Sequence, residues 1–339
     1  MPTAILDTNF QTAVNLWVSN QTSAIATYGD ISGWDVSLVT NMSSAFSGKN
    51  TFNSDISEWD VSAVTDMSSM FKLARNFDKD ISNWDVSAVT NMSSMFNFCN
   101  AFNQDISTWD VSAVTNMSEM FYWALIFNSN ISNWNVSNVT NMSFMFGKTS
   151  DFNQDISSWE RTDGVNGATS TSTLLKVTNM NSMFGLANKF NQVISNWNVS
   201  AVTNMGGMFY AATAFNSDIS NWNVSDVTKM DVMFAGATAF NIDISNWDVR
   251  SVITMERMFD GATAFDVNIS DWASNGGGFS TSSINFTNIF RNATALNASR
   301  TALDIDTTVA ITKANWATNV ICFYGFVNVQ TDKGLKQIK

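Results

Sequence analysis

Large apolar residues recur along the chain with a period of 25 residues. Tryptophan marks the period ten times, at Trp34, Trp59, Trp84, Trp109, Trp134, Trp159, Trp197, Trp222, Trp247 and Trp272. A fixed period of this length indicates a repeat architecture, because a single repeat cannot bury its apolar face and must stack on its neighbours. The pattern therefore predicts one elongated array of coils and not several globular domains.

One segment of each repeat has the apolar spacing of a short helix. Met117, Met120, Phe121 and Ala124 fall at positions i, i+3, i+4 and i+7, which share one helical face. The Thr-Asn pair before the first methionine supplies side-chain oxygens for an N-cap. We expect one helix of about two and a half turns per coil, which depends on its neighbours because so short a helix is unstable alone.

A second segment of each repeat favours a short strand. Ile81, Trp84 and Val86 lie between turn-forming residues in Asp-Ile-Ser-Asn-Trp-Asp-Val-Ser, and these apolar types are common in strands. The Ile-to-Trp spacing departs from strict alternation, so a bulge or turn is expected inside the segment. The predicted fold class is an α/β repeat solenoid, a rod of about ten coils with one short strand and one short helix in each.

The ends of the chain depart from the repeat. Residues 10–18 have the spacing of an amphipathic helix, so residues 1–29 are predicted to form an N-terminal helical cap. Residues 30–295 are assigned to the repeat solenoid. Residues 296–339 are predicted to close the other end as a C-terminal cap, because an uncapped stack would expose unpaired backbone groups and apolar surface that promote association with other chains.

Two insertions, at residues 160–176 and 273–283, follow the repeat tryptophan in their coils. Since one position of the repeat maps to one edge of the stack, both insertions are predicted to project from the same side. That edge is a hypothetical contact surface, with Arg161, Asp163 and Phe279 as candidate binding residues. The alternative is that Gly/Ser/Thr-rich insertions are merely tolerated on a surface.

Composition narrows the function. Hydrophobic residues make up 45% and charged residues 14%, which suits a continuous core with a nearly neutral exterior. A net charge of -12 disfavours nucleic acid and anionic membrane surfaces as partners. The absence of histidine removes the usual general base and the commonest zinc ligand, so we expect no catalytic activity and no cofactor. Cys99 and Cys322 are predicted to be small buried hydrophobes.

Polar columns of the stack have structural and functional interpretations. An Asn column, which includes Asn103 and Asn128, is predicted to form a ladder that satisfies backbone groups at a corner of the coils. Asp55, Asp80 and Asp105 share another column and are weak candidates for calcium ligands. Turn capping is the favoured interpretation, because sister coils replace these carboxylates and the glycine-rich nonapeptide of calcium-binding β-rolls is absent.

Aromatic side chains break the repeat at one place. Tyr122 and Trp123 follow Phe121, and Tyr210 shares the column of Tyr122, where most sister positions are small or polar. An exposed aromatic pair can stack on a sugar ring or contact a protein partner. Packing of these residues against the adjacent coil is the alternative.

At residues 102–121 the repeated motif reads Phe-Asn-Gln-Asp-Ile-Ser-Thr-Trp-Asp-Val-Ser-Ala-Val-Thr-Asn-Met-Ser-Glu-Met-Phe. This motif resembles the 25-residue surface-protein repeat of mycoplasma lipoproteins, which is related to BspA-like leucine-rich repeats. The resemblance covers approximately residues 30–295. It implies a curved, leucine-rich-repeat-like solenoid used in adhesion, host contact or other protein binding. The chain lacks the N-terminal lipobox cysteine of the lipoprotein members.

The leading hypothesis is a non-catalytic surface binding or adhesion protein, located outside the cell or on a cell or virion surface. The alternative is a structural component of a larger assembly, such as a virion or phage surface fibre, because similar arrays occur in viruses. The expected partner is a protein or cell-surface ligand, with a glycan or a second copy of the chain as further options. No signal peptide or transmembrane segment is visible in the sequence, so membrane insertion is not expected.

Overall fold

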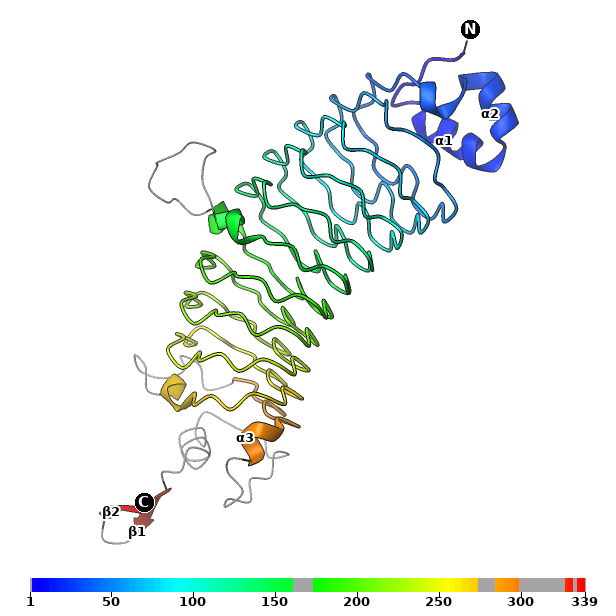
Figure 1. Ribbon diagram of the computed structural model, residues 1–339. Coiled ribbons are helices and arrows are strands. Elements are labelled where there is room, and N and C mark those ends of the chain that lie inside the picture. Colours follow the sequence, from blue (N-terminus) through cyan, green and yellow to red (C-terminus); the bar gives the residue numbers. More distant parts are fainter. Residues whose placement is uncertain (1, 161–172, 274–283, 299–326, 332–333, 339) are drawn as a thin grey trace.

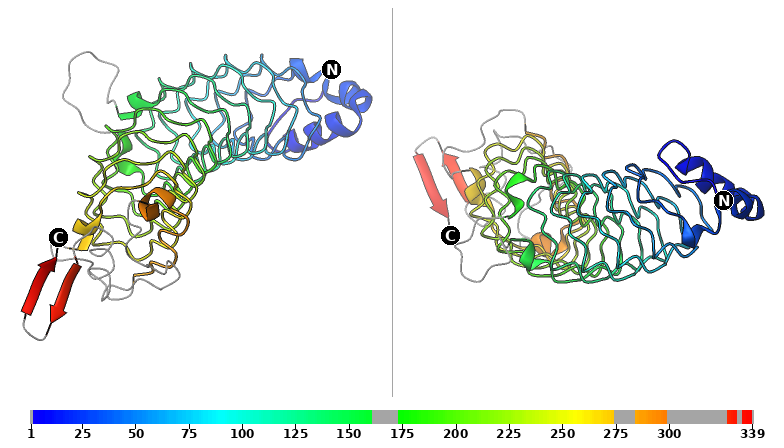
Figure 2. Two further views of the ribbon diagram at one scale, coloured as in Figure 1. Left: turned by 60° about the horizontal axis from the view of Figure 1, so that its bottom comes forward. Right: turned by 90° about the horizontal axis from the view of Figure 1, so that it is seen from above.

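The computed structural model describes residues 2–160, 173–273, 284–298, 327–331 and 334–338. The described residues up to 298 form a curved rod of stacked coils, with the N-terminal helices at one end and α3 at the other (Figures 1 and 2). Its elements are α1 Phe10–Ser19, α2 Gln21–Tyr28, the short 3-10 helices η1 Ile31–Gly33, η2 Ser157–Glu160, η3 Thr173–Lys176 and η4 Ser270–Ala273, then α3 Thr294–Ala298, β1 Val327–Thr331 and β2 Gly334–Ile338. β1 and β2 pair antiparallel with each other.

Backbone hydrogen bonds join each coil to the next. The N–H groups of Met92 and Phe96 donate to the carbonyls of Asn116 and Met120 in the following coil, at 3.0 and 2.9 Å. In the other direction, the N–H of Thr90 donates to the carbonyl of Thr65 at 2.9 Å. These bonds connect main-chain atoms only, so they do not depend on which side chains the coils carry.

The interior consists of apolar columns that run along the rod. The Trp, Phe, Met, Val and Ile positions of the repeat are buried in coil after coil. Equivalent rings stack on one another: Phe96 and Phe121 have ring centroids 5.6 Å apart, and the indoles of Trp59 and Trp84 lie 6.5 Å apart at an interplanar angle of 2°. The predicted burial of the small hydrophobe Cys99 is confirmed, whereas Cys322 lies outside the described residues.

The prediction of a helix in each coil is wrong. In the segment that begins at Met92, Met95 N–H bonds the carbonyl of Met92 and Cys99 N–H bonds that of Phe96, which are tight-turn bonds and not helical ones. Ser94 and Phe98 have φ angles of 56° and 57°, in the left-handed region that a right-handed helix cannot include. Two consecutive turns place residues three and four positions apart on the same side of the chain. Because a helix produces the same spacing of apolar residues, the sequence pattern did not distinguish the two structures.

The prediction of a strand in each coil is also wrong, so the described coils are not the α/β, leucine-rich-repeat-like units that were expected. Trp84 N–H donates to the carbonyl of Ile81 and Val89 N–H to that of Val86, which makes this segment two tight turns. The coils pair instead at one residue each, through isolated parallel bridges such as Asn91 with Asn116. The turns replace the strand because aspartate side chains there bond the backbone two residues ahead.

The predicted helix at residues 10–18 is present as α1, and it covers the first coils of the rod. Phe10 packs edge-on against Trp59, with ring centroids 5.8 Å apart, and Trp17 packs against Trp34 at 6.1 Å. A second helix, α2, was not predicted from the sequence. It follows Asn20, whose side chain accepts a hydrogen bond from Ser23 N–H as the N-cap of α2.

Most of each insertion lies outside the described residues, as do the candidates Arg161, Asp163 and Phe279. The flanking segments are described: η2 and η3 border the first insertion, and η4 precedes the second. η2 and η4 both contain the repeat tryptophan of their coil, so the described segments that precede the two insertions occupy the same position of the repeat. The predicted projection of both insertions from one side concerns residues outside the described part and stays a prediction.

Candidate functional site

Side chains in the constant columns of the repeat form hydrogen bonds between adjacent coils. Trp109 Nε1 donates to the carbonyl of Ile81 in the preceding coil at 3.1 Å, and the tryptophans from Trp59 to Trp272 all make the equivalent bond. The predicted asparagine ladder is confirmed: Asn128 N–H donates to Asn103 Oδ1 at 2.8 Å, and the pattern continues along the column. These side chains therefore have structural partners.

The aspartates that were considered as candidate calcium ligands cap turns. The Oδ1 atoms of Asp55, Asp80 and Asp105 accept hydrogen bonds from the backbone N–H of the serine two residues ahead, at 3.0, 2.9 and 2.9 Å. Donation by the backbone N–H and then the hydroxyl of that serine lowers the pKa of Asp55 and of Asp80, because both bonds favour the charged carboxylate. In the described part of the chain, no group of three or more acidic, His or Cys side chains is arranged to hold a metal ion.

Three neighbouring columns of the repeat are among those whose side chains change from coil to coil, and they carry the largest of the variable aromatic side chains. They are the positions equivalent to Ser94, Asn97 and Phe98, and we call them the variable columns. The first reads Ser44, Ser69, Ser94, Glu119, Phe144, Ser182, Gly207, Val232, Arg257, Asn288; the second Ser47, Lys72, Asn97, Tyr122, Gly147, Gly185, Tyr210, Ala235, Asp260, Arg291; the third Gly48, Leu73, Phe98, Trp123, Lys148, Leu186, Ala211, Gly236, Gly261, Asn292. The neighbouring core position, by contrast, is methionine from Met42 to Met255.

Two of the variable columns are held in the left-handed backbone region, where glycine is the favoured residue. The φ angle is 61° at Trp123, and the equivalent positions of other coils carry Gly48 and Gly236 at 71° and 73°. A non-glycine residue in this conformation costs roughly 1–2 kcal/mol. Large side chains thus stand at positions where the backbone itself would favour glycine, which is typical of functional residues.

The largest of these side chains form one cluster across neighbouring coils. The rings of Phe98 and Trp123 are stacked, with centroids 4.7 Å apart and an interplanar angle of 19°. The ammonium group of Lys148 lies 3.6 Å from the centroid of Trp123, and the guanidinium of Arg75 lies 5.6 Å from that of Phe98. These four side chains make a continuous stack of cation, ring, ring and cation, and both rings are partly exposed.

Tyr122 and Phe144 complete the cluster. Tyr122 meets the rings of Phe98, Trp123 and Phe144 edge to face, at centroid distances of 5.8, 6.1 and 5.8 Å. A Cβ atom on Gly147 would lie 2.9 Å from Tyr122 Cδ2, so the absence of a side chain there leaves room for the tyrosine ring. We call Phe98, Tyr122, Trp123 and Phe144 the aromatic cluster.

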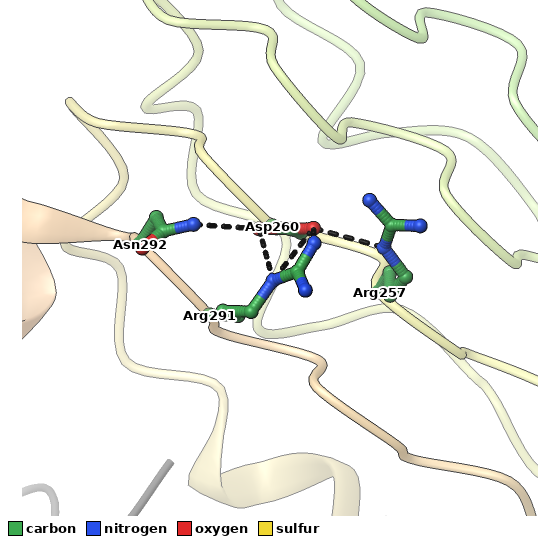
Figure 3. Close-up of polar contacts among 4 residues, drawn as sticks. All are labelled: Arg257, Asp260, Arg291 and Asn292. Atoms are coloured by element: carbon green, nitrogen blue, oxygen red, sulfur yellow. Dashed lines mark hydrogen bonds and ion pairs between the residues drawn. The ribbon is translucent and has the colours of Figure 1, made fainter. Parts of the chain in front are cut away.

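A second cluster in the variable columns is polar (Figure 3). The buried carboxylate of Asp260 accepts hydrogen bonds from Arg257 Nε at 2.9 Å, from Arg291 and from Asn292 Nδ2 at 3.3 Å. Burial alone would raise the pKa of Asp260, but the hydrogen bonds and charges of Arg291 and Arg257 outweigh it, so the pKa is lowered. This cluster ties one coil to the next and is satisfied internally.

The structure brings together only some of the predicted site residues. Tyr122 and Trp123 are in contact, and each also packs against an adjacent coil, which was the alternative interpretation of the pair, while its role in binding stays a prediction. Tyr210 is 42% exposed and three coils away, with glycines at the equivalent positions between. Phe98, Phe144 and the two cations were not predicted as site residues. Their columns carry the signal that marked Tyr122, which is a large or charged side chain where other coils have a small or different one.

A family model described as "Mycoplasma protein of unknown function, DUF285" matches the chain four times, over residues 12–124, 98–170, 162–272 and 239–319. The chain therefore belongs to this repeat family. No curated protein matches the sequence. Within the described residues, none of the helices combines the length and apolar character that a membrane crossing requires.

Proposed function

We propose that this chain is a non-catalytic surface protein that binds a protein or cell-surface ligand through the variable columns of its rod, with the aromatic cluster as the main contact. The observation that carries the proposal is the contrast between columns: core and turn positions repeat almost unchanged, while the aromatic cluster occupies positions that vary. Partly exposed aromatic residues that lie together are typical of binding sites.

The family supports a surface location, and the sequence resemblance to BspA-like repeats supports adhesion or protein binding as the class of function. The geometry favours binding over a purely architectural role for the cluster. The coils close through backbone bonds and core columns, and the same bonds form where single positions of the variable columns carry Gly207, Ala235, Gly236 or Gly261. The coils that carry the aromatic cluster thus hold large side chains that coil closure does not require.

The test replaces each cluster residue by one that the chain itself uses at the equivalent position of another coil. The aromatic variant carries Phe98→Gly, Tyr122→Gly, Trp123→Gly and Phe144→Ser. Fluorescently labelled wild type and variant are applied to a printed array of extracellular protein domains and glycans. We expect the wild type to bind a defined subset and the aromatic variant to lose that binding at least about tenfold, a loss of about 1.4 kcal/mol.

A matched control removes exposed apolar side chains elsewhere on the rod. Leu38, Val193 and Ile253 are 67%, 59% and 46% exposed and lie outside the variable columns. The control variant carries Leu38→Ala, Val193→Asp and Ile253→Thr, each again a residue of its own column. Unchanged binding by the control together with lost binding by the aromatic variant supports the proposal. Equal binding by the aromatic variant and the wild type, or no binding by the wild type, contradicts it.

A further inference from the structure

Two rings of the aromatic cluster, Phe98 and Trp123, present their edges and not their faces. One face of Trp123 lies against Phe98 of the preceding coil and the other lies under Lys148 of the following coil. Phe98 is likewise placed between Arg75 and Trp123. A sugar ring stacks on an exposed aromatic face, which neither of these two rings offers in this arrangement.

The edges of aromatic rings carry the positive part of the ring quadrupole, so they attract negatively polarised groups. The cations beside them add to this attraction. In the described part of the chain, Lys72, Arg75 and Lys148 make no ion pair with a carboxylate. Their charges are therefore available to a ligand.

The single carboxylate in the variable columns of these coils is already engaged. Glu119 Oε2 accepts hydrogen bonds from Ser94 Oγ at 3.1 Å and from Asn97 Nδ2 at 2.7 Å. In the variable columns of these coils, Lys72 and Lys148 stand against this one carboxylate, and Arg75 lies over Phe98, in a molecule of net charge -12. The aromatic cluster is therefore flanked by cations on an acidic protein.

We propose that the aromatic cluster binds an acidic segment of a partner protein, whose carboxylates pair with Arg75 and Lys148 across the ring edges. This inference rests on the proposed function and specifies the class of ligand. Carboxylates complement both the positive ring edges and the unpaired cations, while the apolar parts of the segment cover the rings. The partly exposed ring area and the charges are thus satisfied by the same occupant.

The experiment selects peptides from a phage-displayed random dodecapeptide library on the immobilised wild-type protein, after depletion on the aromatic variant. We expect the selected sequences to be enriched in Asp and Glu. One selected peptide is then synthesised and its affinity measured by fluorescence anisotropy. Lys148→Glu is expected to weaken binding about fivefold or more at low salt, and the difference is expected to shrink at about 0.5 M salt, where exposed charges are screened.

Lys79→Glu is the matched control, because it makes the same charge change outside the variable columns. The inference is supported if Lys148→Glu weakens the binding of the acidic peptide and Lys79→Glu does not. It is overturned if the selected peptides are neutral or basic, if the two lysine variants behave alike, or if no peptide is enriched. If no peptide is enriched while array glycans bind the wild type and not the aromatic variant, the acidic-segment inference fails and the proposed binding function stands. If the aromatic variant binds the selected peptides as the wild type does, both fail.

Discussion

Gly48 and Gly33 allow the strain of the left-handed positions to be measured directly. Both glycines lie in the first coil, both are exposed, and a Cβ atom added at either would meet no heavy atom within 4 Å. They differ in backbone conformation: Gly48 has a φ angle of 71°, whereas Gly33 ends η1 outside the left-handed region. Substitution of each by alanine therefore changes the same atoms in different backbone conformations.

The expected magnitudes follow from two opposing effects. Alanine reduces the conformational entropy of the unfolded chain relative to glycine, which stabilises the folded state by roughly 0.4–1 kcal/mol at a compatible position. Gly33→Ala should therefore be stabilising by that amount. At Gly48 the left-handed conformation adds a cost of roughly 1–2 kcal/mol, so Gly48→Ala should be destabilising by about 0.5–1 kcal/mol. The two variants should differ by roughly 1–2 kcal/mol.

Urea unfolding followed by indole fluorescence provides the assay. Because both substitutions lie in one coil, they report on the same cooperative part of the stack, and equal slopes allow the midpoints to be compared as free energies. If Gly48→Ala is as stable as Gly33→Ala, the left-handed positions carry no strain. Phe98 and Trp123 would then occupy their left-handed positions without a conformational cost, contrary to what is inferred above.

Three further predictions concern the constant columns. Trp109→Phe should destabilise the protein by about 2–4 kcal/mol in urea unfolding, because the buried carbonyl of Ile81 loses its donor and the smaller ring leaves a cavity; a loss below about 1 kcal/mol would contradict this. Asn103→Ala should cost about 0.5–1 kcal/mol, since water can replace the lost acceptor at the exposed N–H of Asn128, whereas Asn103→Asp should keep the bond and the stability. Hydrogen bonds from the side chain and then the backbone of Ser87 lower the pKa of Asp85, so the contribution of Asp85 to stability is present above the unfolded pKa near 4 and is lost as pH falls through the lower folded pKa. Thermal melts from about pH 5 to 2 should therefore show less acid sensitivity in Asp85→Asn than in the wild type. Equal acid sensitivity of the two proteins would refute this role of Asp85.

The sequence predicted the core of the rod more reliably than the shape of its backbone. The period placed Trp84 and Phe96 in buried columns because burial depends on which residues are apolar, and that pattern is visible in the sequence. Helical spacing was correct at α1 but wrong at Met117–Ala124. The two segments differ in what surrounds the apolar residues: Asn and Ser side chains in each repeat bond the backbone locally, as Asn116 Oδ1 does with Ser118 N–H, and this competes with helix and strand bonds.

The candidate site was predictable in part. Tyr122 and Trp123 were identified because they interrupt a column of small or polar residues. Their partners were missed because a stack between Trp123 and Lys148 requires the left-handed turns that bring equivalent positions into register, and the expected helix has a different geometry. The contact between Asp260 and Arg291 was hidden for another reason: the second insertion separates them by 31 residues and removes the simple period.

The same features that misled the secondary-structure prediction explain how this fold can support binding. Each coil is closed by main-chain bonds and by buried columns, and none of these needs a particular side chain in the variable columns. Those columns can therefore carry glycine in one coil and tryptophan in another, at a strain of roughly 1–2 kcal/mol and without loss of the stack. Under the proposed function, ligand specificity is set by which coils carry large or charged side chains, and in this chain the aromatic residues and unpaired cations gather on neighbouring coils around Trp123.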